Sequence, residues 1–175
     1  MKNISKFIIA ICFLFLVTNS FSQETTENYE RNFKLGVGVN TGYPFNDPFN
    51  FNLGADARLQ YNISKTYSIS FTTGFNNLFV EDGTDFSYIP IKVGYKSFIF
   101  SNGVYVMGEI GAALSITDAY DQNSMLFAPS LGFATKYVDI SVRYEFLKDF
   151  PAVRDDVVDK GLGQIMLRLA YGFDL

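Results

Sequence analysis

The sequence predicts an all-β protein, an eight-stranded antiparallel up-and-down β-barrel that crosses a membrane. From Phe33 onward, apolar and polar residues alternate with a period of two in eight segments, as they do in strands with two unlike faces. Short and long connections also alternate, which is typical of transmembrane barrels. Aromatic residues are abundant, with 19 Phe and 11 Tyr, although the mean hydropathy is only +0.10. This composition favours strands with one apolar face.

Residues 1–22 are predicted to be a signal peptide. Lys2 and Lys6 form a positive region, an apolar stretch runs from Phe7 to Val17, and small residues follow at Ser20 and Ser22. The stretch is shorter than the roughly 20 residues that a membrane-spanning helix needs. Cleavage before Gln23 takes the formal net charge from −4 to −6 and removes the only cysteine, so no disulfide or thiolate metal site is expected. Residues 23–32 form a predicted disordered leader, and residues 33–175 form the barrel.

Each predicted strand is identified by its apolar face. The second is the clearest, because apolar residues hold every other position from Phe51 to Ile63 while Asn52, Asp56 and Arg58 lie between them. No helical periodicity competes with this pattern after the signal peptide. The apolar faces run over Phe33–Tyr43, Phe51–Ile63, Tyr67–Phe75, Ile89–Tyr95, Val104–Leu114, Phe127–Phe133, Val138–Phe146 and Ile165–Phe173.

The polar face is expected to line the lumen. Eight glycines lie on it, and an eight-stranded barrel has space inside only for packed side chains. The face also carries charges of both signs, which can pair in the interior, where an unpaired charge is costly. The predicted lumen charge network consists of Lys34, Asp56, Arg58, Lys92, Glu109, Arg143, Glu145 and Arg168.

The two ends of the predicted barrel differ. The short turns carry Lys65, Lys96 and Lys136, whereas the long connections are rich in acidic residues. Aromatic residues gather at the strand ends, as in the interfacial girdles of membrane barrels. A soluble periplasmic barrel that holds a ligand against its apolar face is the alternative arrangement. The long connections are expected at Pro44–Asn50, Asn76–Ser87, Ile116–Met125 and Leu147–Gly163.

Several segments carry a family resemblance. They are Ser-Phe-Ser-Gln at 20–23, YIPIKVGYK at 88–96, VYVMGEIGAAL at 104–114, SLGFATKYVDISVRYEF at 130–146 and LRLAYGF at 167–173. With these segments the chain resembles the small outer-membrane β-barrel domain family of the Bacteroidota, which includes the PorT-like proteins. The resemblance implies the fold, the compartment and the lack of enzymatic activity, but no single function. The alternating apolar end of the chain resembles the signal that the barrel-assembly machinery recognises, with Leu175 in place of the usual Phe.

The sequence offers little catalytic chemistry. It contains no histidine, the usual acid or base near neutral pH, and the processed chain has no thiol. Enzymatic activity and cofactors are therefore not expected. The acidic segments could supply oxygen ligands to Ca²⁺, but they lack EF-hand spacing and are interpreted as solvated loops. The weak metal candidates among them are Asp82, Asp85, Asp155 and Asp156.

Together these features predict a non-enzymatic protein of the cell outer membrane with a structural or interaction role: envelope integrity, surface contact, or assistance to secretion or assembly. The expected partners are membrane lipid and lipopolysaccharide, the assembly machinery, and a protein bound through the long loops. Nucleic acid is excluded, because an acidic chain without a basic stripe cannot neutralise phosphates. Two alternatives stay open: transport or binding of a small hydrophobic molecule or ion through the barrel, and the soluble periplasmic ligand-binding barrel.

Overall fold

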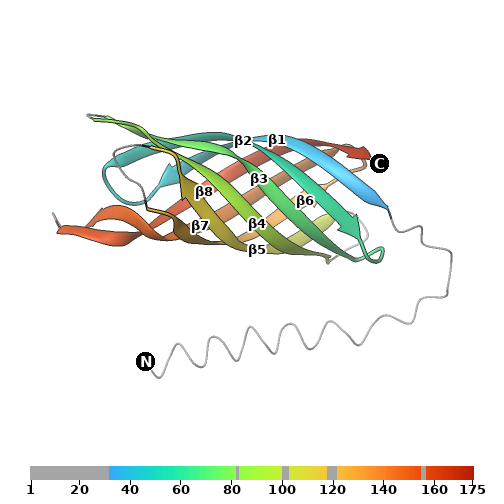
Figure 1. Cartoon of the computed structure of the whole chain (residues 1–175). Helices are drawn as coiled ribbons and strands as arrows, with labels where there is room; N and C mark the ends of the chain where they lie inside the picture. The colour runs from blue at the N-terminus through green and yellow to red at the C-terminus, as the bar shows by residue number, and fades with distance from the viewer. Residues whose placement is uncertain (1–31, 82, 100–102, 118–121, 155–156) are drawn as a thin grey trace, which may run out of the picture.

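The computed structural model describes residues 32–81, 83–99, 103–117, 122–154 and 157–175. They form a closed barrel in which every strand pairs antiparallel with its neighbours in the chain, and the last strand pairs with the first (Figure 1). Within these ranges no helix is long and apolar enough to cross a membrane. The strands are β1 (Phe33–Pro44), β2 (Phe49–Asn62), β3 (Tyr67–Val80), β4 (Phe86–Phe98), β5 (Val104–Ser115), β6 (Ser124–Ala134), β7 (Val138–Arg154) and β8 (Val157–Asp174).

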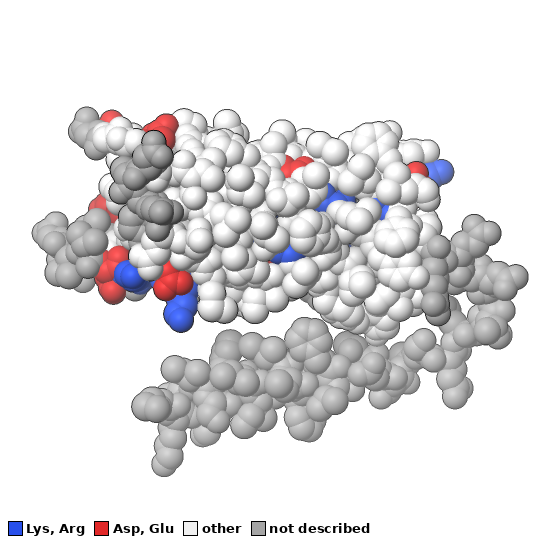
Figure 2. All heavy atoms as spheres, viewed as in Figure 1, with Lys and Arg blue, Asp and Glu red and all other residues white. Residues whose placement is uncertain are grey.

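The barrel is inverted relative to a soluble protein, with its polar face inside and its apolar face outside. On β8, Leu167 is 49% exposed whereas its neighbour Arg168 is 2% exposed. The same alternation runs along the other strands, so large apolar side chains cover the outer wall. Figure 2 shows this wall as a broad white band with little charge between the two ends. The predicted fold class is confirmed, and the burial pattern is the opposite of that expected for a soluble barrel with an apolar ligand inside.

The strands are longer than the sequence pattern predicts, and the loops are correspondingly shorter. β7 has 17 residues and β8 has 18, although about 9–11 are enough to cross a bilayer. The expected loops at Asn76–Ser87 and Leu147–Gly163 were therefore wrong in extent: β3 continues to Val80, and the β7–β8 ladder continues to the pair Arg154–Val157. A register shift between Leu147 and Pro151 interrupts this ladder. The alternation of apolar and polar residues does not predict this part of the strands, because the extended hairpin no longer has one uniformly apolar face.

The lumen is not polar along its whole length, which corrects the prediction of a charged and small-residue interior. At the loop end, buried apolar side chains from seven strands, β2 to β8, form a plug across the barrel. Phe150 lies at its centre, with ring centroids 4.6 Å from Phe86 and 5.4 Å from Tyr88 in edge-on geometry. The plug consists of Phe49, Leu78, Phe86, Tyr88, Ala113, Leu126, Ala128, Leu147, Phe150 and Leu162.

Two positions on the polar face must be glycine, because groups of a neighbouring strand lie too close to leave room for a side chain. A Cβ on Gly111 would overlap the backbone of Ile91 and Lys92 on β4. A Cβ on Gly132 would overlap the ring of Tyr105, its pairing partner on the adjacent strand β5. Both strands can therefore pack large neighbouring groups only because these positions lack side chains.

Aromatic side chains mark both ends of the outer wall. At the turn end Tyr67 stacks on Tyr95 and Tyr137 on Tyr171, each pair with centroids 5.8 Å apart. At the loop end Tyr43 is among the exposed aromatic residues. The two groups occupy the positions that interfacial girdles hold in membrane barrels.

Because the outer wall is apolar, the stability lost when a charge is introduced on it should depend on the depth of that position in the membrane. Val142→Arg, at mid-strand on β7, should lower the free energy of unfolding in lipid vesicles by about 2–4 kcal/mol, because it places a cation at the level of the hydrocarbon core. Val138→Arg makes the same change at the turn end of the same strand and should cost about 0–1 kcal/mol. Both valines are exposed, at 51% and 38%. Urea titration of the refolded barrel measures the difference, and equal losses would contradict a membrane-embedded wall.

Candidate functional site

The middle of the lumen holds a buried cluster of charged side chains centred on Glu109 of β5. This carboxylate accepts hydrogen bonds from Arg58 Nη2 at 3.3 Å and from the Thr72 hydroxyl at 2.8 Å. It also lies 3.8 Å from Lys92 Nζ and 3.6 Å from Arg143 Nη1. Strands β2, β3, β4 and β7 thus each contribute one partner, which ties opposite walls of the barrel together.

Glu145 of β7 extends this cluster toward the apolar plug. Its carboxylate lies 3.4 Å from both Lys92 Nζ and Arg143 Nε. It also accepts a 2.7 Å hydrogen bond from the Tyr88 hydroxyl and a 3.1 Å bond from Gln164. Tyr88 therefore has its ring in the plug and its hydroxyl in the charged cluster, so the apolar and polar layers share a residue.

A second cluster lies on the turn side of the lumen. Arg168 Nε donates to both carboxylate oxygens of Asp56, at 2.8 and 2.9 Å. Asp139 accepts hydrogen bonds of 2.7 Å from Lys96 Nζ and from the Tyr105 hydroxyl, and Arg168 Nη1 lies 3.6 Å from it. Lys96 Nζ also stands 3.7 Å from the centroid of the Tyr105 ring, a cation–π contact.

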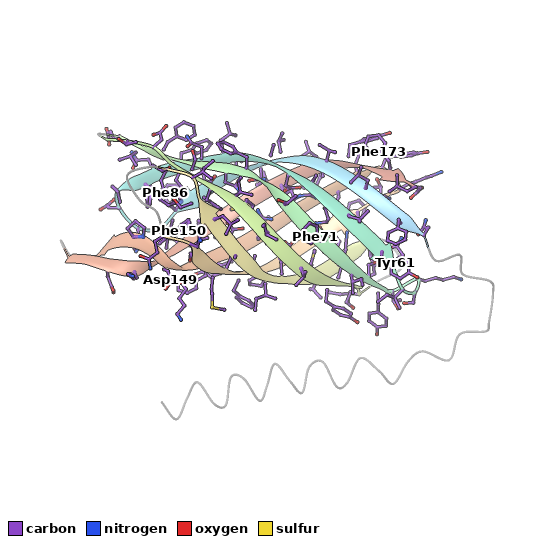
Figure 3. All side chains as sticks on the ribbon, viewed as in Figure 1. Tyr61, Phe71, Phe86, Asp149, Phe150 and Phe173 are labelled. Carbon is purple, nitrogen blue, oxygen red and sulfur yellow. The ribbon has the colours of Figure 1, made fainter. Side chains whose placement is uncertain are left out.

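The structure brings seven of the eight predicted lumen charges into these two clusters. Lys34 is placed apart from them, because the first residues of β1 lie at the rim. There Lys34 Nζ is 3.9 Å from Asp174 and contacts the backbone carbonyl of Lys136. Figure 3 shows Tyr61 and Phe173 at this turn end, and Phe86 and Phe150 at the opposite end.

The sequence analysis missed Lys96 and Asp139 as members of the network. Lys96 was assigned to a short turn, but β4 continues to Phe98 and carries its side chain inward. Asp139 lies on the polar face of β7, but the predicted lumen charge network did not include it. Lys96 and Asp139 each lie an even number of residues from the other inward-facing charges of their strands. Extending that alternation by one or two positions would have predicted that both face the lumen.

The balance of charge in the lumen is slightly positive. Five cations (Arg58, Lys92, Lys96, Arg143 and Arg168) face four carboxylates (Asp56, Glu109, Asp139 and Glu145). Because an uncompensated buried charge is costly, the pairing accounts for the close interleaving of the two signs. The arrangement can bind ions and lock strands together, but it contains no histidine or thiol for nucleophilic catalysis.

The predicted metal ligands are not assembled into a site among the described residues. Asp85 caps its own loop, where its carboxylate accepts hydrogen bonds from Asn77 Nδ2 and the Val80 backbone N–H, each 3.2 Å long. Asp82, Asp155 and Asp156 lie outside the described residues. Within the described ranges, no group of three or more His, Cys, Asp or Glu side chains is placed to hold a metal ion.

The turn end of the lumen opens into a cavity of about 290 Å³. It is lined by strands β1, β2, β4, β6, β7 and β8 and by the turns after β2 and β6. We call this cavity the turn-end vestibule. The two charged clusters form its inner boundary, and the apolar plug closes the barrel beyond them.

Comparison with solved structures identifies the architecture. The chain is similar to the crystal structure of Ail, the attachment invasion locus protein of Yersinia pestis, with a TM-score of 0.53 and 18% identity over 83% of this chain and all of the other. It is similar to the N-terminal β-barrel domain of Pseudomonas aeruginosa OprF, with a TM-score of 0.51 and 10% identity over 82% of this chain and all of the other. The fold is that of an outer-membrane β-barrel.

The similarity extends to a designed protein. A de novo transmembrane β-barrel matches with a TM-score of 0.52 and 13% identity over 80% of this chain and 95% of the other. No family model matches the sequence, and no curated protein does. At these low identities the comparisons establish the fold only, so the role of the protein rests on its own geometry.

The charged lumen predicts an unequal cost for neutralising two carboxylates. Glu109→Gln should lower the free energy of unfolding by roughly 3–5 kcal/mol, because it leaves three buried cations without their shared partner. Asp174→Asn removes a 45% exposed carboxylate that faces Lys34 at the rim, and an exposed pair contributes about 0–1 kcal/mol. Urea unfolding of both variants in lipid vesicles provides the comparison. If the two losses were equal, the Glu109 cluster would not be a structural lock.

Proposed function

We propose that this protein is a non-enzymatic integral outer-membrane barrel whose strands act as a scaffold and whose loop end makes contacts outside the membrane. The observation that carries this proposal is the inversion of the barrel, with large apolar side chains outside and ion pairs inside. Such a wall is stable only in hydrocarbon, and a closed barrel satisfies every backbone hydrogen bond there.

The proposed route to the membrane begins with export by the signal peptide at residues 1–22 and cleavage before Gln23. The barrel-assembly machinery would then insert the chain, guided by its alternating C-terminal strand. On β8 the apolar residues Leu169, Tyr171 and Phe173 all face outward at about half exposure, as an insertion signal read from the lipid side requires. Outer-membrane lipid and lipopolysaccharide would surround the finished wall.

Transport through the barrel is the less favoured function. The apolar plug fills the loop end of the lumen, and the charged clusters fill its centre. An eight-stranded barrel encloses a volume that side chains can fill completely. Because the plug and the clusters occupy the loop end and the centre of the described lumen, we infer an interaction role in preference to a conducting one.

The β7–β8 hairpin is the proposed contact element. Its strands exceed the length of a bilayer crossing by about six residues each, which projects the tip roughly 15 Å beyond the interface. Figure 1 shows it protruding at the loop end of the barrel, and Figure 2 shows charged side chains gathered at this end. The hairpin sequence from 149 to 160 carries Asp149, Asp155, Asp156 and Asp159 against Arg154 and Lys160.

An acidic tip favours a partner protein with a basic surface. Ail has been crystallised with the heparin analogue sucrose octasulfate, a polyanion that an acidic hairpin would repel. The partner proposed for this hairpin is instead a protein with a positively charged surface. Envelope contact or assistance to a secretion complex, as in the PorT-like proteins, are both compatible with such a surface.

Fractionation of the producing cell tests the location. The protein should be recovered in the outer membrane and should begin at Gln23. In detergent it should migrate differently on gels before and after boiling, because a closed barrel resists unfolding until heated. A soluble periplasmic protein without this mobility shift would refute the proposal.

Trypsin added to intact cells tests the orientation. Cleavage should occur in the β7–β8 hairpin, at Arg154 or Lys160, and should spare Lys65 and Lys136 in the turns. A matched variant, Arg154→Gln with Lys160→Gln, should abolish cleavage there and leave the barrel folded. Cleavage at the turn lysines of intact cells would place the loop end inside.

A further inference from the structure

The turn-end vestibule is a cavity with more basic than acidic side chains in its lining, and the proposed contact role does not use it. Five basic side chains line it, Lys34, Arg58, Lys65, Lys96 and Arg168, against two carboxylates, Asp139 and Asp174. The cavity is open at the turn end and closed at the other by the charged clusters and the plug. A closed-ended cavity of this kind can hold a ligand but cannot conduct one.

The carboxylates near the vestibule do not use up its hydrogen-bond donors. Asp56 is engaged by Arg168, and Asp139 by Lys96 and Tyr105. Asp174 reaches Lys34 only at 3.9 Å, beyond hydrogen-bond length. Arg58 in turn pairs with Glu109 at 3.3 Å. These four cations therefore each face a carboxylate, and a ligand must use the N–H donors that the pairs leave unused.

Arg58 provides the most specific sign of a ligand. Its Nε donates to Thr72 and its Nη2 to Glu109, but its Nη1 has no hydrogen-bond partner although the side chain is only 5% exposed. A buried guanidinium nitrogen without an acceptor costs free energy. Arg58 also lines the vestibule. Its Nη1 atom is itself covered, so a small rotation of the guanidinium toward the cavity would bring this donor to an acceptor bound there.

We propose that the turn-end vestibule binds a small oxyanion of the phosphate or sulfate class, with Arg58 as the deep donor and Lys34 as the donor at the rim. Guanidinium and ammonium groups are the usual partners of such anions, and charge-assisted hydrogen bonds are the strong ones. The volume of about 290 Å³ admits a phosphate or a small phosphate ester and excludes a polymer. Because the strands separate the cavity from lipid, the ligand reaches it from the aqueous phase at the turn end.

Isothermal titration of the folded barrel with sodium phosphate tests the proposal. The chain from Gln23 is held in octyl glucoside, which contains no phosphate, with ionic strength kept constant by sodium chloride. We expect saturable binding of one phosphate per barrel, competition by sulfate, and no saturable heat from chloride. The assay is independent of cellular location and partner, so its failure and that of the proposed contact role are distinguishable.

Three variants assign the binding to the vestibule. Lys34→Gln should weaken phosphate binding about tenfold, the loss expected for one charge-assisted contact. Lys148→Gln removes the same charge from an exposed position at the loop end of β7 and should leave the Kd unchanged. Arg58→Gln should abolish binding, with folding checked by the mobility shift on boiling.

The outcomes separate clearly. No saturable phosphate binding tighter than about 10 mM, or equal weakening by Lys34→Gln and Lys148→Gln, would overturn the proposal. If Arg58→Gln does not fold, the Lys34→Gln and Lys148→Gln pair decides alone.

Discussion

Pairing of β1 with β8 is the constraint on which the rest of the molecule depends. It runs from Lys34–Asp174 to Pro44–Gln164 without interruption, so the sheet has no free edge along this seam. Closure satisfies the backbone groups within the sheet, which is what allows an apolar wall to face hydrocarbon. Closure also confines the polar face to a lumen too narrow for bulk water, so each charged side chain there must find a partner among its neighbours.

The charged side chains of the lumen find their partners in layers stacked along the barrel axis. Glu109 and Glu145 each contact two or more cations, and the cations come from strands on opposite sides of the barrel. These contacts act as cross-links within the closed sheet. The shared residue Tyr88 then joins the charged layer to the apolar plug, so that the loop end is sealed by packing and the centre by ion pairs. At the turn end the described lumen contains a cavity of about 290 Å³.

This axial division separates two kinds of surface. The loop end extends into long strands whose connecting sequences are rich in acidic residues, and this is the end for which contact with another macromolecule is proposed. The turn end is concave and basic, suited to a small anion. Among the described residues, the apolar plug and the charged clusters lie between the two surfaces.

The sequence by itself determined which residues face inward and which face outward, because the side-chain period of a strand is two and an inward-facing charge leaves a regular mark, as at Asp56 and Arg58. It also determined the number of strands, since eight segments repeat the pattern. Only the tertiary structure decided which charges meet: Arg168 joins Asp56 across 112 residues, and Lys34 falls at the rim because of the stagger of β1. The plug and the extended β7–β8 hairpin were likewise invisible to the pattern. Phe86 and Phe150 were both expected in loops. Phe86 has the inward phase of Tyr88 and Lys92, because β4 begins earlier than its apolar face suggests. Phe150 is turned inward at the register shift between Leu147 and Pro151, which alternation within the strand does not predict.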